Sequence, residues 1–126
     1  MCERKKNVIG ADDLGLDFIN DLQTKTYTWK PSEEHPEAWG NFGYEQDENG
    51  DNTEVKVYSA MNTDTVMHGL IAQEVKVALD AAGCDTFGGW SEDDNGQQHV
   101  SKSMFVIPLI KAVQELAAKV EALENA

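Results

Sequence analysis

The chain has 126 residues, of which 40% are hydrophobic and 8% aromatic, which suffices for one modest domain. Its 10 basic and 23 acidic residues give a formal net charge of −13. Nucleic acid and anionic membrane surfaces would repel this charge, and no apolar run approaches the roughly 20 residues of a membrane span. We therefore expect a soluble protein that binds neither nucleic acid nor a membrane.

Neither a metal nor another cofactor is expected. Cys2 and Cys84 have no CxxC or Cys/His spacing, so they predict free thiols rather than a zinc site or a disulfide. The run DENGDN at 47–52 resembles the start of a calcium loop, but its glycine is at the fourth position instead of the sixth, and the distal glutamate is not at the loop spacing. This run predicts a turn.

The N-terminal third predicts an exposed segment, a helix and a strand. Residues 1–9 mix charges with a short apolar end and read as a lead-in, with no apolar stretch of signal-peptide length. Asp12 and Asp13 then precede an apolar helical face made of Leu14, Phe18, Ile19 and Leu22. Residues 24–30 alternate Thr with larger side chains and end at a proline, which predicts a strand.

Residues 32–67 are acidic and rich in Gly, Pro and Asn, which predicts a long variable excursion. Asn49-Gly50 is a strong hairpin signal, and the following strand at 53–60 places Val55 and Val57 on one face. We expect a projecting two-stranded β-arm.

A second helix is predicted over residues 69–82, where Gly83 supplies the C-cap. Its apolar face consists of Leu70, Ile71, Val75, Ala78 and Leu79. Residues 85–98 contain Gly88-Gly89 and Asn95-Gly96, which indicates a loop or a second short hairpin.

Residues 104–126 predict a coiled-coil helix, with Ser103 as its cap and Pro108 tolerated in its first turn. Valine occupies every a position of the heptads and leucine every d position: Val106, Leu109, Val113, Leu116, Val120 and Leu123. Lys119 at g and Glu124 at e have the spacing of an interchain ion pair between parallel helices. Valine at a with leucine at d favours a dimer, whereas the apolar residues at e and g favour three chains. We expect a trimer; the alternative is a C-terminal helix packed on its own domain.

The fold class is therefore predicted as α+β, in one domain spanning 1–126. Its long C-terminal helix forms a parallel coiled coil in a homotrimer, and shorter helices and a β-hairpin arm complete it.

Three segments in this order carry a family resemblance: LGLDFINDL followed by TYTWK, then HGLIAQEV at 68–75, then IPLIKAVQELAAKVEAL at 107–123. They resemble the C-terminal intramolecular chaperone domain of bacteriophage endosialidase tailspikes, which is also found on tail fibres and neck appendages. The resemblance implies a trimer that guides the folding of an upstream β-structured fibre of the same precursor. It also implies release by self-cleavage at the domain's N-terminus.

The family's cleavage chemistry is only partly retained. The resemblance implies a start of the form S-D-x-R-x-K, in which the serine is the nucleophile and the lysine its base. Here Arg4 and Lys6 match, whereas Met1 replaces the serine and Cys2 the aspartate. A thioether cannot attack a carbonyl, so we expect this chain to be inactive, with Met1 marking the cleavage point of a released domain.

His68 and Gln73 belong to the matching HGLIAQEV motif and are candidates to orient the scissile peptide or to stabilise the oxyanion. The alternative is that His68 caps the second helix and Gln73 makes a buried hydrogen bond.

The sequence thus predicts a folding and trimerisation module of a phage tail spike or fibre, made in the bacterial cytoplasm and released from its precursor. Two alternatives stay open. One is the membrane-associated transcription factor family whose precursors carry a similar self-cleaving trimer domain. The other is a permanent coiled-coil oligomerisation module without chaperone or protease activity.

Overall fold

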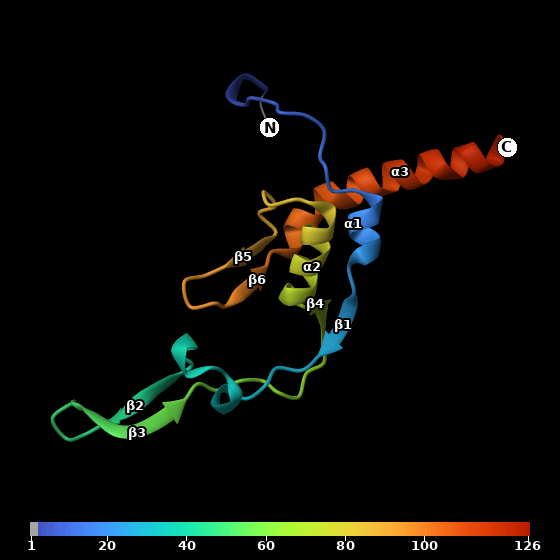
Figure 1. Cartoon of the computed structure of the whole chain (residues 1–126). Helices are drawn as coiled ribbons and strands as arrows, with labels where there is room; N and C mark the ends of the chain where they lie inside the picture. Colours follow the sequence, from blue (N-terminus) through green and yellow to red (C-terminus); the bar gives the residue numbers. More distant parts are fainter. Residues whose placement is uncertain (1–2) are drawn as a thin grey trace. The chain divides into compact units, whose positions relative to one another are not determined.

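The computed structural model describes residues 3–126, which form two compact units (Figure 1). The first unit contains the chain up to Gln23, Leu70–Ser91 and His99–Ala126. The second contains Thr24–Gly69 and Glu92–Gln98. The mixture of helices with small sheets, followed by a C-terminal helix, confirms the α+β class. The trimer and the coiled coil stay predictions.

Over residues 3–126, three α-helices build the first unit: α1 (Leu16–Asp21), α2 (Ala72–Ala82) and α3 (Val106–Glu124). Its core is closed by three aromatic rings from distant parts of the sequence. The ring centroid of Phe87 lies 5.8 Å from that of Phe18 and 5.1 Å from that of Phe105. Around these rings lie the buried side chains Leu14, Val75, Ala78, Leu79 and Cys84. The first unit is therefore held together by contacts between segments that are far apart in the chain.

Replacing Phe18 by alanine is expected to lower the free energy of unfolding by about 3–5 kcal/mol, because this ring is 2% exposed and its loss leaves a cavity. Urea unfolding at fixed protein concentration measures the change. Asn20→Ala, at an exposed position of the same helix, is the control and should change stability by less than about 0.5 kcal/mol. Equal losses in the two variants would contradict the central place of Phe18.

The strands of the described part of the chain form three two-stranded sheets. Strand β1 (Thr24–Tyr27) pairs with β4 (Met67–Leu70), and β5 (Trp90–Glu92) pairs with β6 (Gln98–Val100). Strand β2 (Phe42–Gln46) pairs antiparallel with β3 (Asn52–Tyr58), as expected for the arm. The second short hairpin is confirmed as well.

The turn between β2 and β3 has the predicted chemistry. A carboxylate oxygen of Asp47 accepts hydrogen bonds from the backbone amides of Asn49, at 2.9 Å, and Asp51, at 3.0 Å. Gly50 has φ +81°, a conformation that glycine adopts without strain. The run that resembles a calcium loop is therefore a turn, as predicted.

The ends of the predicted elements shift where distant contacts compete with the local pattern. The predicted first helix starts only at Leu16, because the Asp12 carboxylate accepts the Leu14 amide at 2.8 Å and makes a turn there. The predicted second helix starts at Ala72, because residues 67–70 form β4. The first strand ends at Tyr27 instead of residue 30.

The caps of the helices give one confirmation and one correction. Gly83 ends α2 with φ +69°, and its amide donates to the Asp80 carbonyl, as the C-cap prediction requires. The prediction that Ser103 caps the last helix is wrong. Ser103 lies inside the 3₁₀ turn η4 (Lys102–Phe105), and Phe105 directly precedes α3.

Candidate functional site

One face of α3 packs on its own chain. Pro108 and Ala112 are buried, and the Lys111 ammonium donates a hydrogen bond to the backbone carbonyl of Asp12. One turn further on, the Glu115 carboxylate lies so close to Gly15 that a Cβ at this glycine would overlap it. The N-terminal half of α3 is thus fixed against the segment that leads into α1, and its buried face is defined.

The heptad residues lie on a different face of α3. At about 100° per residue, the centre of the a/d positions is about 90° around the helix from Pro108 and Ala112. These six side chains are 45% to 76% exposed: Val106, Leu109, Val113, Leu116, Val120 and Leu123. Ile110 at position e, 49% exposed, widens the same face. We call this face the seam. A contiguous apolar surface of this kind is typical of a protein interface.

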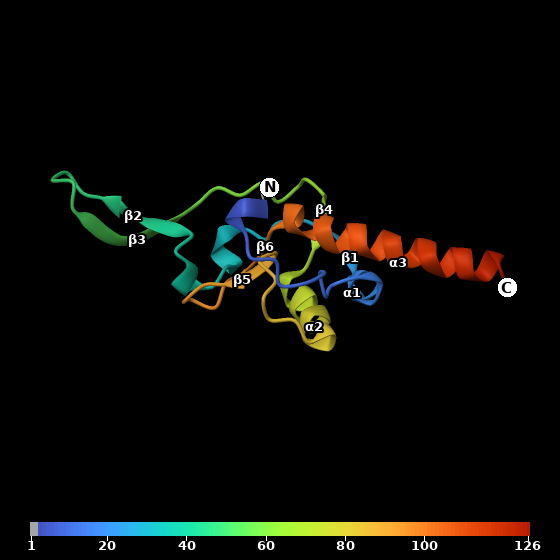
Figure 2. The same cartoon turned by 90° about the horizontal axis from the view of Figure 1, so that it is seen from above.

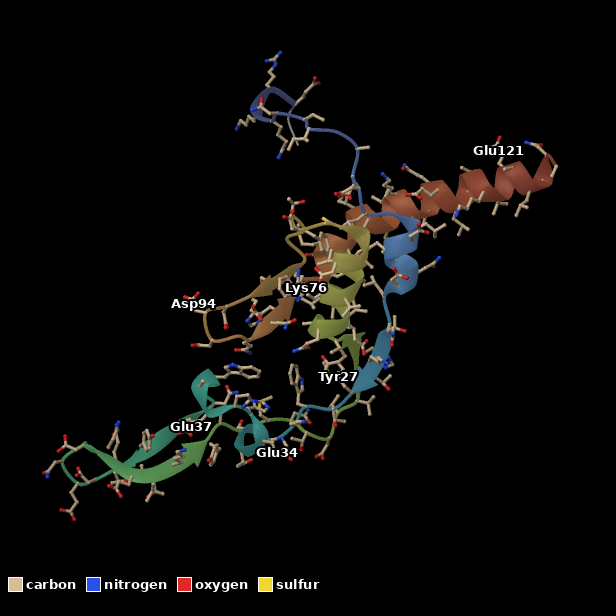
Figure 3. The ribbon with its side chains drawn as sticks, in the orientation of Figure 1. Tyr27, Glu34, Glu37, Lys76, Asp94 and Glu121 are labelled. Carbon is tan, nitrogen blue, oxygen red and sulfur yellow. The ribbon has the colours of Figure 1, made fainter. Side chains whose placement is uncertain are left out.

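The C-terminal half of α3 carries the seam beyond the other two helices. Every residue from Ala117 to Glu124 is exposed, and Figures 1 and 2 show this part of α3 extending past α1 and α2. Glu121 marks it in Figure 3. The idea that the C-terminal helix packs on its own domain therefore holds for one face of its N-terminal half. It does not account for the seam.

The predicted cleavage residues lie at the N-terminus of the first unit. Arg4 belongs to the short 3₁₀ turn η1 (Glu3–Lys5), and the Lys6 amide donates to the Glu3 carbonyl at 3.1 Å. Both side chains are exposed. Met1 and Cys2 lie outside the described residues. The pairing of Lys6 with a nucleophile at position 1 therefore stays a prediction.

The motif residues His68 and Gln73 belong to different units. His68 is an exposed residue of β4, so it does not cap α2, whose N-cap is Ile71. Gln73 lies in the first turn of α2 with an exposed side chain, which excludes the buried hydrogen bond considered above. Their support of cleavage stays a prediction.

The β-arm has an aromatic face and an aliphatic face. On the first, the ring centroid of Phe42 lies 5.7 Å from that of Tyr44 and 6.0 Å from that of Tyr58. The Lys56 ammonium lies 4.7 Å from the centre of the Phe42 ring and 2.8 Å from a carboxylate oxygen of Glu37, labelled in Figure 3. The hydrogen bond with Glu37 raises the pKa of Lys56. This one cation is thus held on an otherwise acidic arm.

The aliphatic face of the arm contains Val55 and Val57, which are 53% and 50% exposed. At the base of the arm, the Trp39 indole donates to the Asn95 carbonyl at 3.1 Å, and the buried Ser32 hydroxyl donates to the Ser59 carbonyl at 2.6 Å. These bonds fix the base of the arm within the second unit.

Over residues 3–126, no three His, Cys, Asp or Glu side chains lie so that they could hold a metal ion. None of the helices in this range is both long and apolar enough to cross a membrane.

A family model described as the chaperone of endosialidase matches residues 3–84, well over half of the chain. The chain belongs to this family. Neither the curated proteins nor the solved structures give a match.

The endosialidase-chaperone match confirms the recognised resemblance and covers most of the residues predicted to act in cleavage. Arg4, Lys6, His68 and Gln73 all lie within the matched range. The helix α3, with its seam, lies beyond it. The family match and the exposed seam are therefore independent observations.

One exposed apolar residue of α3 outside the seam was not predicted from the sequence. Ile107 occupies heptad position b, where a coiled coil normally carries a polar residue, and it is 55% exposed. It lines an open pocket with Met104, which is 45% exposed. An apolar residue at position b was the feature of the sequence from which this exposed side chain could have been predicted.

Proposed function

We propose that this endosialidase-chaperone chain acts as a homotrimeric intramolecular chaperone, which directs the folding and trimerisation of an upstream phage tail spike or fibre. The observation that carries the proposal is the seam, which the chain's own core leaves exposed although its residues repeat in strict heptads. The precursor would be made in the cytoplasm of the bacterial host. Family membership supports the chaperone role.

The energetics of the seam explain why assembly and folding would be linked. Burying the six apolar side chains of the seam against other chains would offset part of the backbone entropy that is lost when the helix is ordered. The exposed half of α3 is therefore stabilised by its partners. Three chains joined in register at one end hold the upstream segments at high effective concentration, which lowers the entropic cost of aligning a fibre.

We further propose that the domain is released by serine–lysine autoproteolysis just before position 1, with Lys6 as the base. The reaction occurs once per chain, because cleavage removes the substrate. With Met1 in place of serine, this chain has no nucleophile at that position, because a thioether cannot attack a carbonyl.

The unaltered chain is expected to sediment at about three times its 13.9 kDa monomer mass, because three copies of the seam bury one another. Analytical ultracentrifugation over a concentration series measures this. A monomer at every concentration would contradict the proposal.

A fibre experiment separates the chaperone from a permanent oligomerisation module. The yield of folded fibre is compared with the domain present, absent, or replaced by a generic trimeric coiled coil. The chaperone proposal expects high yield only with the domain. Equal yield with the generic coil would favour the permanent module.

A further inference from the structure

The first unit contains an open pocket of about 220 Å³ on the side of α3 away from the seam. Leu14, Phe87 and Pro108 form much of its apolar lining, and the half-exposed Met104 and Ile107 lie at its edge. At about 100° per residue, Ile107 lies roughly 150° around α3 from the centre of the seam. A coiled coil built on the seam would therefore not cover this pocket.

Two acidic residues, Asp12 and Asp13, are among those that line the pocket. The Asp12 side chain accepts the Leu14 amide at 2.8 Å, and its backbone carbonyl accepts the Lys111 ammonium. These two bonds hold the acidic side of the pocket in place beside the apolar lining. A complementary occupant is an apolar side chain next to positive charge.

The lead-in of this chain has that chemistry. Arg4, Lys5 and Lys6 are three of the ten basic residues and form the sole run of them in the sequence. Val8 and Ile9 follow two residues later and are 79% and 103% exposed, so the single chain gives these apolar side chains no cover.

We propose that residues 4–9 of one copy bind in the pocket of a second copy, with Val8 or Ile9 against Ile107 and the basic run toward Asp12 and Asp13. The proposal rests on the trimer proposed above. A head-to-tail contact of this kind closes into a ring when three chains are related by one rotation axis, as in a parallel trimer.

Residues 4–9 are poorly placed to bind in the pocket of their own chain. Ile9 is only three residues ahead of Asp12, whose side chain and carbonyl are both held, so the chain would have to reverse within Gly10 and Ala11. Both of these residues are exposed, and the Val8 and Ile9 side chains are 79% and 103% exposed in the single chain. Binding in a second copy would order the lead-in, and with it Lys6, only after assembly.

Disulfide cross-linking tests the contact in the 126-residue chain. In a Cys2→Ser, Cys84→Ala background, the pair Ile9→Cys and Ile107→Cys is oxidised with copper phenanthroline and compared with the pair Ile9→Cys and Val77→Cys. Val77 is 69% exposed on α2 and does not line the pocket. We expect covalent dimers and trimers from the first pair, at several times the yield from the control pair.

Sedimentation of the same samples separates the outcomes. If the chain is a trimer but both pairs cross-link equally, this inference is wrong and the trimer proposal still stands. The same holds if the first pair forms its disulfide within one chain. A monomer would overturn the proposed function as well.

Trypsin digestion tests the same contact without engineered cysteines. Cleavage after Arg4, Lys5 and Lys6 is expected to be slow in the unaltered trimer and about tenfold faster in Ile9→Ser, because one buried apolar side chain is lost. High salt should also accelerate it, since screening weakens the attraction to Asp12 and Asp13. Val77→Ser is the control and should leave the rate unchanged. Equal rates in both serine variants would contradict the inference.

Discussion

The Val113→Asp variant is expected to sediment as a monomer at concentrations where the unaltered chain sediments as a trimer. Val113 is a central a position of the seam, so assembly would bring three carboxylates together in an apolar layer. At about 3 kcal/mol for each buried charge, the trimer loses about 9 kcal/mol, or six orders of magnitude in its association constant. Sedimentation velocity over a concentration series measures the loss.

The neighbouring position supplies a matched control. Gln114→Asp adds the same charge to the same turn of α3, but position b faces away from the seam, so the trimer should persist. Far-UV circular dichroism should show the first unit folded in both variants, because neither side chain is buried in the single chain. Dissociation of both variants, or of neither, would show that the seam is not the interface.

Features of the fold that depend on neighbouring residues could be predicted from the sequence. Asn49-Gly50 fixes a tight turn through its own backbone preferences, so the arm was predicted correctly. Gly83 ends α2 because a left-handed residue closes the last turn. The exposed face of α3 was predicted because alternating steps of three and four place valine and leucine on one stripe.

Features that depend on distant partners could not be predicted. The pairing of β4 with β1, some forty residues away in sequence, takes Gly69 and Leu70 out of the helix that their neighbours' periodicity suggested. The link from Lys111 to Asp12 and the pocket beside Ile107 likewise join segments that no local pattern connects. For the candidate site, the sequence identified Lys6 as the base and showed that Met1 replaces the serine. It did not predict the surroundings in which such a pair would react.

Restoring serine at position 1 behind an upstream fibre segment is expected to restore self-cleavage just before that serine. A hydroxyl can attack the preceding carbonyl once a base removes its proton, whereas the methionine thioether has no proton to lose. Lys6 is the candidate for this base, because it stands five residues after position 1, as the lysine of the family's pattern does. In this background Lys6→Ala should slow cleavage about 10²–10⁴-fold, the usual contribution of a positioned general base. Gel electrophoresis of the precursor and its two products follows the reaction.

Lys5→Ala is the control, because it removes one cation from the same run and leaves the base, so cleavage should slow much less than in Lys6→Ala. Combining Met1→Ser with Val113→Asp then asks whether the chemistry needs the assembled seam. The lead-in is exposed in the single chain, so no partner chain would hold Lys6 against the serine there, and the combined variant should cleave as slowly as Lys6→Ala. Rapid cleavage by a monomer would separate release from assembly, and unimpaired cleavage by Lys6→Ala would remove the lysine from the mechanism.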